Sequence, residues 1–156
     1  MLEKSSRRNP QKSTARIAIV ASAYNADYVD GMLDAALAAL AEAGVDQVEL
    51  VRVPGAFEIP VVAAKLARRK RQRLGAVICL GVILRGQTAH AEHIGKNVSR
   101  LLGDLAIENG MPIIYEVLLL ENKTQAKARC LSAKTNRGAE AAHTALEMVE
   151  VMREIR

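Results

Sequence analysis

Four short runs rich in apolar and β-branched residues divide this chain, and a longer segment with apolar residues at helical spacing follows each of them. Runs of this length and composition are typical of strands buried in a parallel sheet. They are "ARIAIVAS" at residues 15–22, "QVELVRV" at 47–53, "AVICLGVI" at 76–83 and "PIIYEVLLL" at 112–120. Strands that alternate with helices in this way predict an α/β domain, in which right-handed crossovers place helices on both faces of one sheet.

The segments between the strands carry helix signals. Asn25 is placed to cap the first helix and Gly44 to end it, and Pro60 suits the first position of the second helix. Further helices are expected at residues 91–110, 124–131 and 138–155.

We predict a flavodoxin-like, three-layer α/β/α sandwich with a four-stranded parallel sheet in the order 2-1-3-4. Residues 16–156 are expected to form a single domain, which is an ordinary size for one hydrophobic core. Residues 1–15 are polar and basic and are expected to form a disordered arm. Ligands of such sheets bind in the crevice beyond the carboxyl ends of the strands, so a functional site is expected in those loops.

Composition narrows the class of protein. No apolar run approaches the roughly 20 residues that a membrane span needs. The polar N-terminus lacks the apolar centre of a signal peptide. Cys79 and Cys130 form neither a CxxC pair nor part of a larger even set, which favours reduced, packed thiols. These features predict a cytoplasmic protein without a membrane partner.

The net charge of +5 is modest, but the basic residues are bunched. Four of them lie in the arm, and six lie in "KLARRKRQR", residues 65–73. Such a run could bind nucleic acid. No aromatic residue is interleaved with the charge, so we favour a solvated helix face and expect no nucleic-acid partner.

The stretch "VICLGVILRGQTAHAEHIG", residues 77–95, changes character in its middle. A buried strand ends there in hydrogen-bonding and titratable groups, at the edge of the sheet where a ligand is expected. Three of the four aromatic residues in the chain are also placed at or just beyond strand ends, namely Tyr24, Phe57 and Tyr115. Rings gathered at that rim favour a flat, π-rich ligand, although they could instead fill packing gaps between loops.

Three segments, "VPGAFEIP", "LGVILRGQTAH" and "RCLSAKTNRGAEAA", resemble the 6,7-dimethyl-8-ribityllumazine synthase family in sequence, order and spacing. The resemblance runs from about Arg16 to the C-terminus without a large insertion or gap. It implies a flavodoxin-like subunit. It also implies an enzyme that condenses 5-amino-6-(D-ribitylamino)uracil with 3,4-dihydroxy-2-butanone 4-phosphate, releases phosphate and water, and uses no cofactor.

The resemblance further implies which residues bind the substrates. Tyr24 matches the aromatic residue that stacks on the pyrimidine, and Tyr115 matches an aromatic residue presented to a neighbouring subunit's site. The residues that match the pocket for the ring and the ribityl chain are Ala56, Phe57, Glu58, Val82, Ile83 and Leu84. Those assigned to the phosphate are Gly86, Gln87, Thr88 and Arg129. By the same resemblance, Arg129 reaches the phosphate from the adjacent subunit.

Physical chemistry agrees with parts of this assignment. Gly86 lets the backbone approach an anion, and a helix that begins just downstream offers free N–H groups. His90 matches the family's catalytic histidine. An imidazole titrates near neutrality and can transfer protons as a Schiff base forms and phosphate leaves. The pyrimidine's own amine is the nucleophile, so the protein mainly has to hold two reactants in attack geometry.

Departures from the family pattern leave an alternative open. Glu116 stands where the family often has glycine, and a carboxylate near an anion site would repel a phosphate unless it points away. The alternative is a non-catalytic or re-engineered oligomeric scaffold of the same fold. Such a scaffold would have no need of the matched site residues.

Other ligands fit the sequence less well. A metal ion shared by His90, Glu92 and His93 would lack a further ligand of matching spacing, so no metal site is predicted. A flavin-binding or phosphate-accepting relative would need hydroxyl-rich or acidic side chains after the first strand, where only Ser22 stands.

Assembly is implied by the resemblance alone. The family forms homopentamers with active sites between subunits, and these occur singly, in pairs or as icosahedral capsids. The turn at residues 133–138 carries no insertion, so a capsid is permitted. If a capsid forms, riboflavin synthase is a candidate cargo.

Overall fold

The computed structural model describes residues 13–155. These residues form one parallel sheet in the order β2-β1-β3-β4. Its strands are β1 (Ile17–Ser22), β2 (Val48–Val53), β3 (Ala76–Leu84) and β4 (Ile113–Leu120). The helices are α1 (Ala26–Glu42), the 3-10 turn η1 (Ala56–Glu58), α2 (Ile59–Ala67), α3 (His90–Asn109), α4 (Lys123–Cys130) and α5 (Arg137–Glu154).

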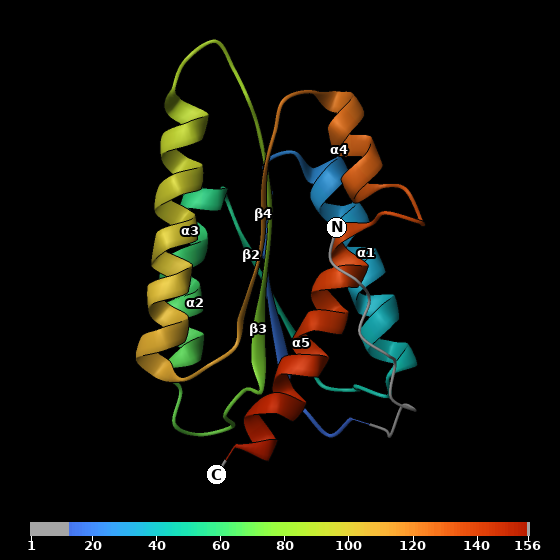
Figure 1. The fold of residues 1–156 in the computed structure, drawn as a ribbon, viewed down its shortest axis with the longest axis vertical. Helices are drawn as coiled ribbons and strands as arrows, with labels where there is room; N and C mark the ends of the chain where they lie inside the picture. The colour runs from blue at the N-terminus through green and yellow to red at the C-terminus, as the bar shows by residue number, and fades with distance from the viewer. Residues whose placement is uncertain (1–12, 156) are drawn as a thin grey trace.

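Helices cover both faces of the sheet (Figure 1). The pair α2 and α3 packs on one face, and α1, α4 and α5 lie on the other. The flavodoxin-like α/β/α sandwich and the strand order predicted from the sequence are confirmed. Of the arm predicted for residues 1–15, all but the last three residues lie outside the described part of the chain.

Alternation along the strands divides the core into two halves. In β1, Ile17 and Ile19 pack beneath α1 and α5, whereas Ala18 and Val20 pack beneath α2 and α3. All four are fully buried. Removing a large aliphatic side chain from water stabilises the fold by about 1.5–3 kcal/mol, so the central strands supply much of the stability.

The β2 strand is more exposed because it lies at one edge of the sheet. Only Val53 among its six residues is buried, and Leu50 is 44% exposed. This explains why "QVELVRV" carries charged residues within a strand, whereas the central β1 and β3 strands are nearly continuous in apolar residues.

The α5 helix packs directly on the backbone of α1. A Cβ atom placed on Gly138 would lie 1.9 Å from the carbonyl oxygen of Met32, so only glycine permits this approach. Asn136 fixes the same junction. Its Nδ2 donates to the carbonyl oxygens of Cys130 (2.8 Å) and Gly31 (3.2 Å), and its Oδ1 accepts from the Gly138 amide at 2.8 Å.

Two local predictions were wrong in part. Asn25 occupies the N-cap position of α1, but it has left-handed backbone angles and its side chain makes no capping bond. Instead, Nδ2 donates to the Val82 carbonyl at 2.7 Å, an acceptor 57 residues away that no local pattern reveals.

The second error concerns the basic run at residues 65–73. The α2 helix ends at Ala67, so most of these cations lie in the following turn and not on a helix face. Arg69 leaves the helix direction to make two hydrogen bonds to Glu49 of β2, at 2.8 and 3.0 Å. Gln72 then adopts a positive φ of 52° as the chain turns into β3.

Candidate active site

The carboxyl ends of the strands face the loops at the top of Figure 1, and most predicted site residues lie in these loops. The β1–α1 loop carries Tyr24, and η1 carries Phe57 and Glu58. The loop from β3 to α3 carries Gln87 and Thr88, and it projects beyond the sheet. A parallel sheet brings these segments together although they are distant in sequence.

Tyr24 and Glu58 are held on either side of Gly55. The Tyr24 amide donates to the Pro54 carbonyl at 3.0 Å. The Gly55 amide donates to Glu58 Oε2 at 2.9 Å. A Cβ atom on Gly55 would lie 2.9 Å from the Tyr24 ring and 3.0 Å from that carboxylate oxygen, so glycine allows the two side chains to meet.

The aromatic rings at this edge are presented outward. Tyr24 is 70% exposed and Phe57 is 61% exposed, which is unusual for large apolar side chains in an otherwise aliphatic protein. Beside them, Ala56 is buried and Glu58 is half-buried. The arrangement offers flat apolar faces next to a carboxylate that can accept hydrogen bonds.

The Asn25 side chain ties this aromatic loop to the end of β3. Its bond to the Val82 carbonyl places the β1–α1 loop against the last three residues of that strand. Val82 is buried, whereas Ile83 and Leu84 are half-buried. The sequence did not reveal this role for Asn25, because an asparagine before a helix is most simply read as a cap.

The loop from Arg85 to Ala89 is exposed throughout, and α3 begins directly after it. A Cβ atom on Gly86 would meet nothing within 4 Å, so the backbone there is open to an approaching group. The His90 amide donates to Thr88 Oγ1 at 3.4 Å, and His90 is the first residue of α3. The N–H groups at this helix start therefore lie beside Thr88, as an anion site requires.

Arg85 anchors this loop to the neighbouring strand. Its amide donates to the Leu120 carbonyl at 2.8 Å, and its Nε donates to Glu121 Oε1 at 2.9 Å. The guanidinium also lies 3.9 Å from Glu92, which pairs with Lys96 at 3.1 Å. The hydrogen bond from Lys96 and the charges of Lys96 and Arg85 lower the pKa of Glu92 from its ordinary value.

Tyr115 lies within the sheet and not at its carboxyl edge, so its predicted position at a strand end was wrong. It is the third residue of β4 and pairs with Cys79 in the middle of β3, because β4 continues for five residues to Leu120. The ring is 40% exposed. Burial raises the pKa of Tyr115, and a hydrogen bond with Ser99 partly opposes this.

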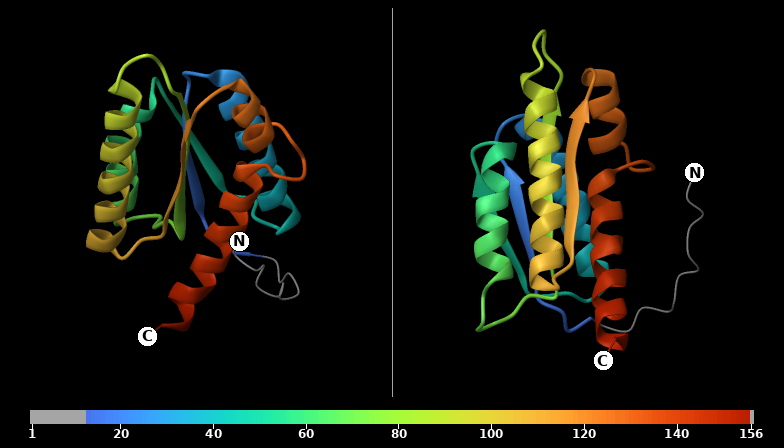
Figure 2. Two further views of the ribbon diagram at one scale, coloured as in Figure 1. Left: turned by 45° about the horizontal axis from the view of Figure 1, so that its top comes forward. Right: turned by 60° about the vertical axis from the view of Figure 1, so that its left-hand side comes forward.

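Arg129 is not brought to the loop that holds Gln87 and Thr88. It is an exposed residue of α4, on the opposite face of the sheet from α3 (Figure 2). Within one protomer, Arg129 and the loop that holds Gln87 and Thr88 therefore lie on different sides of the sheet.

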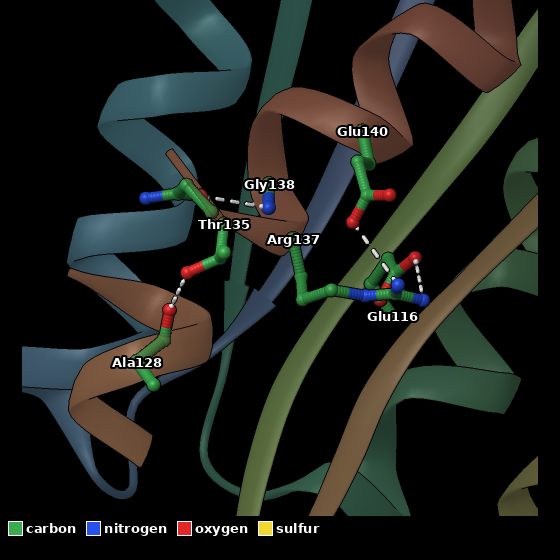
Figure 3. Close-up of polar contacts among 7 residues, drawn as sticks. Glu116, Ala128, Thr135, Arg137, Gly138 and Glu140 are labelled. Carbon is green, nitrogen blue, oxygen red and sulfur yellow. Dashed lines mark hydrogen bonds and ion pairs between the residues drawn. The ribbon is translucent and has the colours of Figure 1, made fainter. Parts of the chain in front are cut away.

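Glu116 is engaged by a cation on the α5 side of the sheet (Figure 3). Arg137 donates to both of its carboxylate oxygens, at 3.2 Å each, and also pairs with Glu140 at 3.0 Å. Burial raises the pKa of Glu116, and the adjacent guanidinium opposes that shift. Since α3 covers the other face, this carboxylate points away from the loop suited to an anion.

Residues 13–155 contain neither a metal-binding cluster nor a membrane-spanning helix. No group of three or more His, Cys, Asp or Glu side chains is arranged there to hold a metal ion. Within the same range, no helix has the length and apolar character to cross a membrane. The two buried thiols are unpaired, and burial raises the pKa of Cys79 to about 12, so it stays protonated.

An open parallel sheet with aromatic rings, a carboxylate, a histidine and an anion-suited helix start at its carboxyl edge defines an α/β enzyme that acts on small molecules. The chain belongs to the 6,7-dimethyl-8-ribityllumazine synthase family, whose profile matches residues 14–153. The family membership inferred from the three motifs is thereby confirmed. As a member of this family, the chain is a transferase of riboflavin biosynthesis.

Several relatives carry the name 6,7-dimethyl-8-ribityllumazine synthase. That of Syntrophus aciditrophicus is 40% identical over 142 residues, which cover 90% of this chain and 91% of that protein. That of Kineococcus radiotolerans is 41% identical over 143 residues, covering 90% and 87%. The archaeal protein of Pyrococcus furiosus is 37% identical over 140 residues, again covering 90% and 87%. The similarity therefore spans nearly the whole of each chain.

Proposed function

We propose that this protein condenses 5-amino-6-(D-ribitylamino)uracil with 3,4-dihydroxy-2-butanone 4-phosphate to form 6,7-dimethyl-8-ribityllumazine, with release of phosphate and water. The observation that carries the proposal is the junction of Tyr24, Gly55 and Glu58 at the carboxyl edge of the sheet. It sets a π-face beside a hydrogen-bond acceptor, which suits a heterocycle that carries a polyhydroxylated chain.

The pyrimidine lies on the Tyr24 ring in this proposal. Glu58 accepts hydrogen bonds from the ribityl hydroxyls, and backbone groups at the end of β3 contact the heterocycle. The pocket for this substrate consists of Tyr24, Ala56, Phe57, Glu58, Val82, Ile83 and Leu84, with Tyr115 supplied to a neighbouring subunit's site. The bond from Asn25 to Val82 supports this grouping, because it holds two of the pocket's segments together.

The phosphate of the second substrate binds at Gly86, Gln87 and Thr88, against the start of α3. Open space at Gly86 and the free N–H groups of the helix start support this placement. Arg129 completes the site from the adjacent subunit. Its position on the opposite face of the sheet supports a shared site, because one protomer does not supply both halves.

His90 transfers protons during the reaction. The amine of the pyrimidine attacks the ketone carbon, and water leaves as the Schiff base forms. Loss of a proton from the carbon next to the imine then lets the C–O bond to phosphate break, and the phosphate leaves as an anion. The resulting enol becomes a ketone, the ribitylamino nitrogen adds to its carbonyl carbon, and loss of a second water closes the ring. His90 lies two residues after Thr88, so an imidazole beside the bound phosphate can accept a proton from the substrate carbon and return one to a leaving oxygen. No covalent enzyme intermediate is needed.

The assembly that fits this site is a cytoplasmic homopentamer or a larger assembly of pentamers, built from a single domain at residues 16–156. Active sites lie between neighbouring subunits. If the pentamers close into a capsid, riboflavin synthase is a suitable cargo. Light scattering on the purified protein distinguishes a pentamer from paired pentamers and from a capsid.

A turnover assay tests the proposed reaction. The two substrates are mixed with the purified protein, and the absorbance and fluorescence of the lumazine are followed. We expect product formation well above the spontaneous rate. Turnover at the spontaneous rate would instead support the oligomeric scaffold of the same fold.

A further inference from the structure

A depression of about 420 Å³ lies at the amino edge of the sheet, opposite the candidate active site. It is bounded by the start of β1, the turn before β3, the end of α3 and the last turns of α5. None of the residues assigned to the proposed reaction contributes to it. The depression therefore calls for a separate explanation.

Arg16, Arg73 and Arg153 are among the residues that line the depression, and Arg16 also borders a smaller depression beside Glu49. Arg153 is occupied by Glu150 at 2.8 Å and by Thr14 at 3.2 Å. Arg16 and Arg73, by contrast, make no ion pair with any residue between 13 and 155. Among the described residues, then, these two guanidinium groups on the same depression have no ion-pair partner that would compete with an anion.

The ordinary reason for cations at this edge does not account for these two. Helices that cross over a parallel sheet end at its amino edge, and cations near their C-termini interact favourably with the helix dipoles. That explanation fits Arg153, which lies in the last turn of α5. Arg16 belongs to no helix, and Arg73 follows the end of α2 by six residues, beyond the last turn where the dipole acts.

Apolar side chains line much of the rest of the depression, together with Thr14, Gly75 and Gly110. Met111 and Val149 are 5% and 4% exposed, and Met152 is 39% exposed. Methionine adapts its shape to flat or irregular apolar groups. Two guanidinium groups without an ion-pair partner between residues 13 and 155, beside such a surface, suit an amphipathic anion. Guanidinium suits phosphate oxygens, and covering the apolar surface removes it from water.

We propose that this depression binds a phosphorylated small molecule that carries an apolar group. Arg16 and Arg73 hold the phosphate, and Met111, Val149 and Met152 cover the apolar part. The volume suits a small organic phosphate, since ligand sites of this kind run from about 300 Å³ upward. The site is independent of the proposed reaction, so the failure of one does not decide the other.

Phenyl phosphate is the probe that combines both properties, and isothermal titration calorimetry on the full-length protein measures its binding. Phosphate can also bind at the candidate active site, so the titration is repeated with Arg129→Gln. We expect saturable binding of phenyl phosphate that survives Arg129→Gln. The double variant Arg16→Gln/Arg73→Gln should bind at least about 10-fold more weakly, because it loses two charge-assisted contacts.

A matched control separates a built site from general attraction to a basic surface. Lys70→Gln/Arg71→Gln removes the same charge from the neighbouring turn, and neither residue lines the depression. It should change the dissociation constant less than about two-fold. Equal weakening by the two double variants, or no weakening by Arg16→Gln/Arg73→Gln, would overturn the proposal.

Two further titrations examine the apolar contribution. Inorganic phosphate should bind the depression more weakly than phenyl phosphate does, and equal affinities would refute a role for the apolar surface. Met152→Glu places a carboxylate on the half-exposed rim, so it should weaken phenyl phosphate binding without disturbing the core. If Arg16→Gln/Arg73→Gln does not fold, Met152→Glu still tests the proposal, because unchanged binding of phenyl phosphate by this variant would refute it. A circular dichroism spectrum and a melting temperature like those of the wild-type protein would show that either variant remains folded.

Discussion

Glu116 and Arg137 form a two-point ion pair that joins β4 to α5. Nε and one terminal nitrogen of Arg137 each donate to a different carboxylate oxygen at 3.2 Å. Glu116 is only 6% exposed. Burial raises its pKa despite the neighbouring guanidinium. For Arg137, burial lowers the pKa, but the charges of Glu116 and Glu140 outweigh it and the net shift is upward. The two partners are not equivalent. Removing Arg137 would leave Glu116 buried without its paired cation, which is costly, whereas Arg137 would keep its ion pair with Glu140 if Glu116 were removed.

The first prediction follows from this asymmetry. Arg137→Met should lower the free energy of unfolding by about 3 kcal/mol at neutral pH, since it strands the Glu116 carboxylate. Adding Glu116→Gln should restore much of that loss, because an amide carries no charge to desolvate. Urea unfolding at one fixed protein concentration measures all three proteins. A double variant as unstable as Arg137→Met would show that lost packing, and not the stranded charge, is responsible.

The second prediction concerns pH. The pKa of Glu116 is raised above the ordinary 4.5, so the folded protein holds this proton more tightly than the unfolded chain does. The stability that Glu116 contributes is therefore complete below about pH 4.5 and is lost as the pH rises through the raised value. The wild-type protein should lose stability relative to Glu116→Gln over that window. Unfolding curves at a series of pH values provide the test, and a difference that grows in the opposite direction would reject it.

The strand order and the layers of this fold could be predicted because each strand can be recognised from its own residues. An apolar run such as that of β3 indicates a buried strand without any reference to distant parts of the chain. The pair of Glu116 and Arg137 could not be found in this way, because its partners are 21 residues apart and meet only after α5 folds onto the sheet. The sequence accordingly left Glu116 as an unexplained departure from the family pattern.

The candidate site was predictable to a similar extent. Tyr24 and Glu58 follow strand ends, and the carboxyl ends of parallel strands share one edge. Asn25 occupies the N-cap position that sequence patterns recognise, but its side chain makes a distant hydrogen bond that they do not reveal. The placement of Arg129 away from Gln87 within one protomer depends on how helices are distributed over the two faces. For that reason its part in the site rested on resemblance and not on spacing.

The third prediction tests the contact between α1 and α5. Gly138→Ala should lower the free energy of unfolding by about 2 kcal/mol or more, because its Cβ would sit 1.9 Å from the Met32 carbonyl and backbone must move. Gly103→Ala is the matched control, since its Cβ would meet nothing within 4 Å on the exposed face of α3. That control should gain about 0.5–1 kcal/mol from helix propensity. Similar effects at both positions would contradict the contact.

The fourth prediction concerns Arg85, which anchors the loop proposed to bind phosphate and neutralises two carboxylates beside it. Arg85→Gln should raise the KM for the butanone phosphate about three- to five-fold, as expected for exposed ion pairs, with little change in kcat. The KM for the pyrimidine should stay constant. Added salt should shrink the difference from wild type, because it screens Glu92 and Glu121.

A control on α3, the helix that follows this loop, sharpens the test. Arg100→Gln removes an exposed guanidinium that pairs with Asp104 at 3.3 Å, away from the loop. Its kinetic constants should match those of the wild-type enzyme. If Arg85→Gln raised both KM values equally, the substitution would be disturbing the loops at the carboxyl edge of the sheet in general, and not the binding of phosphate in particular.

The last prediction asks whether the site is shared between subunits. His90→Ala should lower kcat by about 100-fold or more while leaving residual turnover, because proton transfer is lost and positioning remains. Arg129→Ala should mainly raise the KM for the butanone phosphate.

If His90 and Arg129 meet only across an interface, subunits of the two variants should complement one another. In randomly reassembled equal mixtures, about a quarter of the sites would then combine an intact His90 with a neighbour's intact Arg129. Turnover of the mixture, measured at low butanone phosphate, should exceed the mean of the two separate variants. Activity equal to that mean would place both residues in one subunit's site, and the arrangement proposed here would be incorrect.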